Sequence, residues 1–233
     1  MEKKEVIYEG KAKKVWSTAD PSLVVIEFKD EATAFDGTKK ATIENKGEIN
    51  CAMSAILFEY LESFHVPTHF IRRIGPQELL CRRVQIIPVE AVMRNIAAGS
   101  LVKRLGFPDG QELKPPIFET YLKNDELHDP MINEFHAQAL KVFTPVEFRA
   151  MFRLTSRINV ILRSFFDRRN LLLVDFKLEF GRFENTLILA DEISPDTCRI
   201  WDKHTHKKLD KDRFRFDLGD VESAYNEVLR RIS

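Results

Sequence analysis

Apolar residues recur at two different spacings along the chain, and the two spacings predict different elements. Short apolar runs at 6–8, 15–16 and 23–28 are bounded by polar turns, which is typical of strands in an antiparallel sheet. Later runs of this kind predict strands over 70–74, 79–88 continued by 89–94, 171–180 and 186–193. Sheet segments are therefore expected in both halves of the chain.

The other spacing, an apolar residue at every third or fourth position, predicts helices. It is clearest over 49–64 and over 145–169, where Thr144 is expected to cap the helix. Shorter helices are predicted at 101–105 and from about Leu218 onward. Residues 107–135, rich in Pro and Asp, are expected to form a long functional loop.

The order of these elements predicts an α+β fold. We expect two interlocked lobes in one compact unit, with residues 1–80 forming an N-terminal sheet lobe and residues 81–233 a mixed lobe. A cleft is expected between them.

Composition narrows the classes of function. Lys plus Arg and Asp plus Glu both number 36, so the zero net charge argues against nucleic-acid and membrane partners. Three cysteines without a CxxC pair favour reduced thiols. The N-terminus lacks an apolar signal core, and no run approaches the roughly 20 apolar residues of a membrane span, which predicts a cytoplasmic protein. Homo-oligomer formation is left open.

Three charges alternate along the predicted strand 171–180. Asp175, Lys177 and Glu179 share one face, because successive side chains of a strand point to opposite sides. The apolar run before them indicates a buried strand, on which charges are costly unless they face a cleft, a metal or a ligand. The alternative is the solvated face of an edge strand.

A second acidic group ends the next predicted strand. Asp191 and Glu192 lie there, with Asp196 just beyond. If the two strands form a hairpin, Glu179 and Asp191 approach each other and predict a Mg²⁺ site, since magnesium is usually held by one or two carboxylates plus phosphate oxygens and water.

Two further segments suggest anion binding. Residues 10–13, GlyLysAlaLys, lie between two short strands, and Lys11 and Lys13 are expected to share a face and reach phosphate oxygens; a lysine-rich surface hairpin is the alternative. At 94–100 a strand ends at Arg94 and a helix begins near Ser100, which suits an anion, although an ordinary Ser-capped helix fits equally well.

The remaining polar segments are less specific. The loop 123–130 contains His128, which is more often a solvated residue than a base. His204 and His206 have no acid or Cys at zinc-ligand spacing and predict a charged turn. In 211–215, either arginine can belong to a surface charge run or contact an anion.

Together and in this order, these segments resemble the SAICAR synthetase family, the phosphoribosylaminoimidazole-succinocarboxamide synthases. The resemblance covers nearly the whole chain and is carried by six motifs, at 8–13, 89–104, 123–130, 173–181, 191–202 and 210–215. It implies a kinase- and ATP-grasp-like fold, with the nucleotide between the N-terminal sheet and the rest. It also implies a ligase of purine biosynthesis that joins carboxyaminoimidazole ribotide to L-aspartate. The implied reaction uses ATP and Mg²⁺ and proceeds through an acyl phosphate.

The resemblance also implies a role for each site residue. The implied ATP-binding residues are Gly10, Lys11, Ala12, Lys13 and Lys123. The implied metal ligands are Glu179 and Asp191, and the residues implied at the reacting centre are Asp175 and Lys177. The implied substrate-binding residues are Arg94, Ser100, Asp129, Asp196, Arg199 and Arg215. Asp36 is interpreted as a structural or ligand-orienting residue, because the family is expected to accept Asn there.

Two other functions compete with this interpretation. One is a small-molecule kinase that uses the same Mg·ATP apparatus without aspartate. The other is a non-catalytic nucleotide- or RNA-binding module, which the zero net charge disfavours for RNA.

Overall fold

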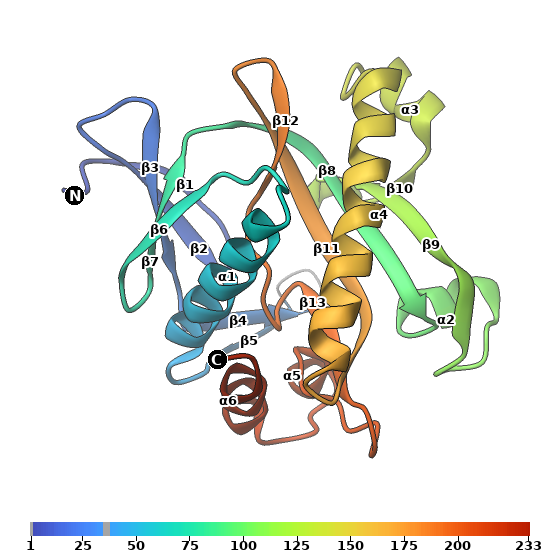
Figure 1. The fold of residues 1–233 in the computed structure, drawn as a ribbon. Helices are drawn as coiled ribbons and strands as arrows, with labels where there is room; N and C mark the ends of the chain where they lie inside the picture. Colours follow the sequence, from blue (N-terminus) through green and yellow to red (C-terminus); the bar gives the residue numbers. More distant parts are fainter. Residues whose placement is uncertain (1, 35–37) are drawn as a thin grey trace.

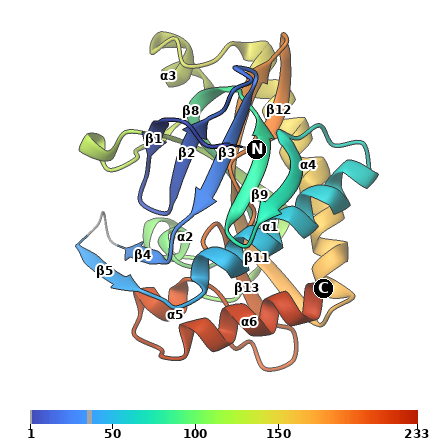
Figure 2. The same cartoon turned by 90° about the vertical axis from the view of Figure 1, so that its left-hand side faces the viewer.

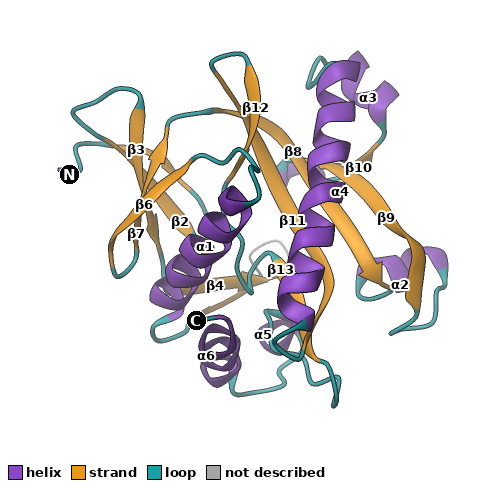
Figure 3. Ribbon diagram, viewed as in Figure 1, coloured by secondary structure: helices purple, strands orange, loops and turns teal. Residues whose placement is uncertain are grey.

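The computed structural model describes residues 2–34 and 38–233, and its strands form two large antiparallel sheets (Figures 1 and 3). The first sheet has the order β1-β2-β3-β7-β6. Its strands are β1 (Val6–Glu9), β2 (Lys13–Ser17), β3 (Leu23–Phe28), β6 (Phe70–Gly75) and β7 (Glu78–Arg82). The predicted lobe boundary at residue 80 falls inside β7, and the two-lobe division stays a prediction.

The second sheet has the order β10-β9-β8-β11-β12, with β13 also paired to β11. Its strands are β8 (Gln85–Ile96), β9 (Glu112–Leu122), β10 (Met131–Ile132), β11 (Leu171–Phe183), β12 (Thr186–Ala190) and β13 (Cys198–Asp202). A separate ribbon joins β4 (Glu31–Ala34) to β5 (Lys39–Thr42). The second sheet supplies most of the functional side chains discussed below.

Helices pack against both sheets, which confirms the α+β class. They are α1 (Lys46–Ser63), α2 (Ser100–Leu105), α3 (Glu134–Ala139), α4 (Pro145–Asp167), α5 (Asp212–Arg215), α6 (Val221–Ile232) and a 3₁₀ turn, η1 (Asp125–Leu127). Helix α4 lies along β8 and β11, whereas α1 packs on the first sheet and beside α6 (Figures 1 and 2). No helix in the described part of the chain is long and apolar enough to span a membrane.

The predicted start of α4 is confirmed in detail. The Thr144 hydroxyl accepts a hydrogen bond from the Glu147 N–H (3.2 Å), and the Glu147 carboxylate accepts one from the Thr144 N–H (2.7 Å). This reciprocal arrangement satisfies two N–H groups that a helix start otherwise leaves unpaired. Pro145 occupies the first turn, where a missing N–H costs nothing.

Two expectations from the sequence are wrong. The strand expected over 79–94 is interrupted at residues 83–84, and its two parts belong to different sheets. The long loop expected over 107–135 contains β9, an 11-residue strand. Pro115 and Pro116 do not prevent β9, because they lie where its pairing with β8 is irregular: Arg94 pairs with Ile117, but Ile96 pairs with Glu112.

Candidate active site

One cavity of about 830 Å³ lies between the β1–β2 turn, the second sheet and the segment after β12. All fifteen residues that the sequence assigned to a site line it: Gly10, Lys11, Ala12, Lys13, Arg94, Ser100, Lys123, Asp129, Asp175, Lys177, Glu179, Asp191, Asp196, Arg199 and Arg215. Residues far apart in the sequence are thus brought together by the fold. Their individual roles stay predictions. Asp36 lies outside the described residues.

The floor of this cavity follows from strand register. In β8, the residues Glu90, Val92 and Arg94 alternate on one face, and directly paired residues of neighbouring strands share that face. The pairs place three rows across β9, β8 and β11: Tyr121, Glu90 and Glu179; Glu119, Val92 and Lys177; Ile117, Arg94 and Asp175. The opposite face carries residues such as Met93 and Phe176, which are buried in the apolar core. Charged residues therefore gather on one side of a buried sheet.

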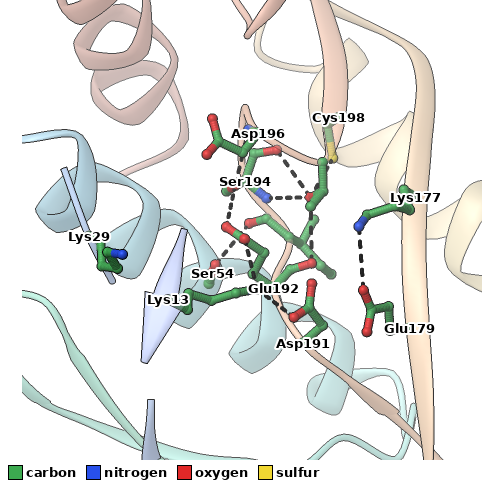
Figure 4. A network of polar contacts seen from close by, with 12 residues as sticks. Lys13, Lys29, Ser54, Lys177, Glu179, Asp191, Glu192, Ser194, Asp196 and Cys198 are labelled. Atoms are coloured by element: carbon green, nitrogen blue, oxygen red, sulfur yellow. Dashed lines mark hydrogen bonds and ion pairs between the residues drawn. The ribbon is translucent and has the colours of Figure 1, made fainter. Parts of the chain in front are cut away.

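Lys13 meets two consecutive carboxylates at the end of β12. Its ammonium forms ion pairs with Asp191 and, at 2.8 Å, with Glu192 (Figure 4). Consecutive strand residues normally point apart. Asp191 has φ 64, in the left-handed region, so the strand alternation is broken where both carboxylates reach Lys13. Burial alone would lower the pKa of Lys13, but these carboxylates outweigh it and raise the pKa above its ordinary value.

Glu179 is shared by two other lysines. It pairs with Lys123 and, at 3.4 Å, with Lys177, whose ammonium also contacts Glu90 at 2.7 Å. Burial opposes the charge of Lys177, but the two glutamates raise its pKa above the ordinary value. We call Lys13, Lys123 and Lys177 the lysine cluster. It brings several cations to one end of the cavity.

The predicted Mg²⁺ ligands are carboxylates, whose oxygens are the donors that a hard cation prefers. Glu179 lies within β11 and pairs with Ala190, the last residue of β12, and Asp191 follows Ala190 directly. Among residues 2–34 and 38–233, no group of three His, Cys, Asp or Glu side chains is arranged to hold a metal. Two carboxylates are nevertheless the usual protein contribution to a magnesium site, if phosphate and water complete it.

Arginines dominate the other end of the cavity. Asp175 accepts hydrogen bonds on one oxygen from Arg94 and Arg199, both at 2.8 Å. Arg199 also donates to Asp212 at 2.8 Å, and Arg215 donates to the same carboxylate at 2.7 Å. Burial disfavours the charge on Arg199, but Asp175 and Asp212 outweigh burial and raise its pKa. The carboxylates therefore hold these guanidinium groups in fixed positions.

Gly99 makes room for this arrangement. Its backbone has φ 58, and a Cβ built on it would lie 2.5 Å from a guanidinium nitrogen of Arg199. Gly99 is also the residue that precedes α2, and Ser100, expected as a possible cap, accepts instead from Arg94 at 3.2 Å. Gly99 therefore serves the packing of Arg199, which the sequence alone did not reveal.

Asp196 belongs to a buried network beneath the cavity. Its carboxylate pairs with Lys46 at 2.8 Å and accepts from the Tyr225 hydroxyl at 2.7 Å. Its N–H donates to Ser194, whose hydroxyl donates to Glu192 at 2.6 Å (Figure 4). Burial opposes the ionisation of Asp196, but its lysine neighbours keep the pKa of the carboxyl below the usual range. The network links Asp196 to the Glu192–Lys13 pair.

One detail differs from the sequence interpretation, and two others add to it. Lys11 precedes β2 instead of sharing a strand face with Lys13, and it pairs with Asp125 at 2.7 Å. Of the two candidate arginines in 211–215, Arg215 lines the cavity, whereas Arg213 donates to the Lys208, Leu218 and Gly219 carbonyls. The Asp129 carboxylate accepts from the Asn124 N–H at 2.8 Å and so orders its loop.

Sequence reasoning missed several residues at the cavity. Glu90 lies on the same face of its strand as Arg94, four residues away, so the period-two spacing of strand residues was a usable signal. Tyr121 lay in a segment taken for a loop. Lys211 at the cavity and Lys46 buried beneath it come together at Asp196 only through the fold. Lys211 lies 3.8 Å from the Asp196 carboxylate, and burial lowers its pKa.

The fold and cavity define a protein that handles small, highly charged ligands, and comparisons with known proteins narrow this class. The SAICAR synthetase family model matches residues 6–232. A phosphoribosylaminoimidazole-succinocarboxamide synthase of Clostridium botulinum (strain Okra / Type B1) is 53% identical, with both chains covered completely. The crystal structure of that synthase from Ehrlichia chaffeensis has a TM-score of 0.96 at 46% identity, covering 98% of each chain. A SAICAR synthetase in complex with ADP has a TM-score of 0.95 at 50% identity, covering 98% of this chain and 97% of that one.

The chain therefore belongs to the SAICAR synthetase family. It is an ATP-dependent carbon–nitrogen ligase of purine biosynthesis.

Proposed function

We propose that the protein condenses carboxyaminoimidazole ribotide with L-aspartate and releases SAICAR, ADP and phosphate. One observation carries the proposal: a single cavity holds the lysine cluster at one end and arginines at the other. Lysines and arginines are the usual partners of phosphate and carboxylate. A phosphate donor and an anionic acceptor can therefore be bound together in one cavity.

The chemistry is proposed to proceed through an acyl phosphate. An oxygen of the ribotide carboxylate attacks the γ-phosphorus of ATP, and the bond to the β-phosphate oxygen breaks to release ADP. The aspartate amine then attacks the acyl carbon, loses a proton, and phosphate leaves. Activation is needed because a free carboxylate has no good leaving group.

The residues contribute mainly positioning and charge neutralisation. Lys11, Lys13 and Lys123, with the backbone of Gly10 and Ala12, would hold the ATP phosphates. A magnesium ion held by Glu179 and Asp191 would supply Lewis-acid neutralisation of phosphate charge when bound. All of these proposed phosphate and metal ligands line the cavity.

The acceptor substrates would occupy the opposite end. Arg94, Ser100, Arg199 and Arg215 would contact the ribotide, together with Asp196, while Asp129 would help to receive aspartate. Asp175 and Lys177 would lie at the reacting centre, since Asp175 pairs with the arginines and Lys177, two residues further on the same face of β11, belongs to the lysine cluster. Cytoplasmic location stays a prediction from the sequence.

An ADP-release assay tests the proposal. With ribotide and Mg·ATP, release should depend on aspartate, and mass spectrometry should find the succinocarboxamide. ADP release at full rate without aspartate, with a stable phosphorylated product, would instead indicate a small-molecule kinase with the same cavity.

A further inference from the structure

Glu119 is a buried carboxylate behind the arginine end of the cavity, and it has no role in the proposal above. It lies on β9, and only 7% of the residue is exposed. Register places it opposite Val92, diagonal to Arg94 and on the same face of the sheet. The apolar side chain of Val92 also separates it from Lys177, which is held by Glu90 and Glu179 instead.

Both oxygens of Glu119 are used. One accepts from Arg94 Nε at 2.6 Å and from the Tyr121 hydroxyl at 2.9 Å. The other accepts from Arg104, whose guanidinium also donates to the Tyr121 oxygen at 2.7 Å. The four side chains therefore form a closed hydrogen-bonded set, in which Glu119 holds two arginines in place.

The contacts of Arg94 divide by strength and direction. Its Nε and Nη1 make short bonds to Glu119 and Asp175, at 2.6 and 2.8 Å. Its Nη2 makes only longer ones, to the Ser100 hydroxyl at 3.2 Å and the Tyr121 hydroxyl at 3.3 Å. Because neutral hydroxyls are weaker partners than carboxylates, Nη2 is the nitrogen that a ligand anion can engage most readily.

We propose that Glu119 is a positioning residue that orients Arg94 so that its Nη2 and the Ser100 hydroxyl face the anionic group of the ribotide. This inference rests on the proposed function. Glu119 acts through Arg94 and does not itself line the cavity. A planar guanidinium that is fixed at two nitrogens loses less freedom on binding a ligand than a mobile one.

If Glu119 influenced ligand binding only through its charge, removing that charge would have the opposite effect on anion binding. At and behind the arginine end lie four guanidinium groups, of Arg94, Arg104, Arg199 and Arg215, and three carboxylates that pair with them, of Asp175, Glu119 and Asp212. Glu119→Gln adds one net positive charge and should tighten anion binding if only charge matters. If orientation matters, binding should weaken, since an amide cannot accept all three donors.

The experiment is steady-state kinetics of Glu119→Gln and Glu119→Asp with each substrate varied in turn. We expect the KM for the ribotide to rise about ten-fold or more in both variants, with the KM for ATP near the wild-type value. Glu119→Asp keeps the charge and shortens the reach, so it tests orientation even if Glu119→Gln fails to fold. Glu112→Gln is the matched control, because Glu112 lies on the same strand in an exposed pair with Lys114.

A double-mutant cycle separates positioning from general structural damage. If Glu119 acts through Arg94, Glu119→Gln should have little further effect on the ribotide KM in an Arg94→Lys background. An unchanged or lowered KM in both Glu119 variants, or an equal effect in both backgrounds, overturns the inference. The proposed function fails by a different result, namely a wild-type enzyme whose ADP release ignores aspartate.

Discussion

At the scale of single residues, most carboxylates of the cavity are already paired with a cation. Glu179 and Asp191 pair with lysines, and Asp175 lies between two arginines. At Asp191 burial opposes ionisation, but the neighbouring lysines outweigh burial and keep the pKa of the carboxyl below its usual range. A bound polyphosphate would take over the lysines as partners, and its metal ion would take over the carboxylates that these lysines now neutralise.

The two proposed metal ligands can be tested singly. Glu179→Gln and Asp191→Asn keep the side-chain shape but remove an anionic oxygen donor, and we expect turnover to fall by about a hundred-fold or more. Thermal stabilisation by ADP should lose its dependence on Mg²⁺ in the same variants. Asp167→Asn is the control, since Asp167 pairs with Lys203 at the surface. Wild-type turnover in both site variants would remove the metal assignment.

His69 predicts a specific loss of stability in acid. It is buried against Phe58 with its ring centroids 5.3 Å apart, and burial lowers its pKa to about 4. In the unfolded chain the ordinary value is about 6.5, so the unfolded state binds the proton first. The stability of the native state is thus intact above about pH 6.5 and falls as the pH drops toward 4, by about 3 kcal/mol for this residue.

Urea unfolding at pH 7 and pH 4 measures that loss. The His69→Gln variant should lose less stability between the two pH values than the wild type does. His204→Gln, at an exposed histidine near Asn170, should follow the wild type. Equal losses in the wild type and in His69→Gln would show that His69 does not carry the acid sensitivity.

At the scale of elements, α4 illustrates how a local signal controls a long helix. Thr144→Ala removes the hydroxyl that accepts the Glu147 N–H, and we expect it to lower the free energy of unfolding by about 1 kcal/mol. Urea denaturation at pH 7 measures this. Arg149→Ala, at an exposed position of α4, should change stability by less than about 0.5 kcal/mol. A Thr144 effect no larger than this control would contradict the capping role.

The other half of the cap adds a pH dependence. The Arg182 guanidinium, bonded to Glu147, together with the Thr144 N–H and hydroxyl contacts, lowers the pKa of Glu147, although burial partly opposes this. The pair therefore stabilises the fold above the ordinary Glu pKa of about 4.3 and less below it. The difference in stability between wild type and Glu147→Gln should shrink from pH 7 to pH 4 in urea unfolding. A constant difference would argue that ionisation is not involved.

Elements with strong local signals were predictable from the sequence, and others were not. Strand β3, helix α1 and the cap of α4 follow from periodicity and turn residues. Strand β9 was missed because its prolines disfavour a strand locally, whereas pairing with β8 decides the outcome. Similarly, β13 has no strong pattern of its own and forms along β11.

At the scale of the whole molecule, one apolar core joins the two large sheets. Its largest buried cluster contains Phe28 of the first sheet, Phe176 of the second, Leu57 of α1 and Leu162 of α4. The residues that line the cavity could be named from motifs, but their neighbours from distant segments could not. Contacts such as Lys46–Asp196 join segments 150 positions apart, and no local pattern encodes them.

This shared core predicts a single unfolding transition. The chain has two tryptophans, Trp16 on β2 of the first sheet and Trp201 on β13 of the second. The variants Trp16→Phe and Trp201→Phe each leave a reporter in one sheet. For each variant, the urea midpoint followed by tryptophan fluorescence should equal the midpoint followed by circular dichroism. A fluorescence midpoint that departs from it would show that the sheets unfold independently.

The alternation of faces in β8, β9 and β11 limits how this chain can change over generations. Exchanging one amino acid for another affects one position, but gaining or losing a single codon inside β8 would rotate every later side chain of that strand to the other surface. The Arg94 side chain would then point into the apolar core, and the Met93 side chain would point into the cavity. These three strands can therefore accept substitutions, whereas insertions or deletions of one residue inside them would disrupt the site.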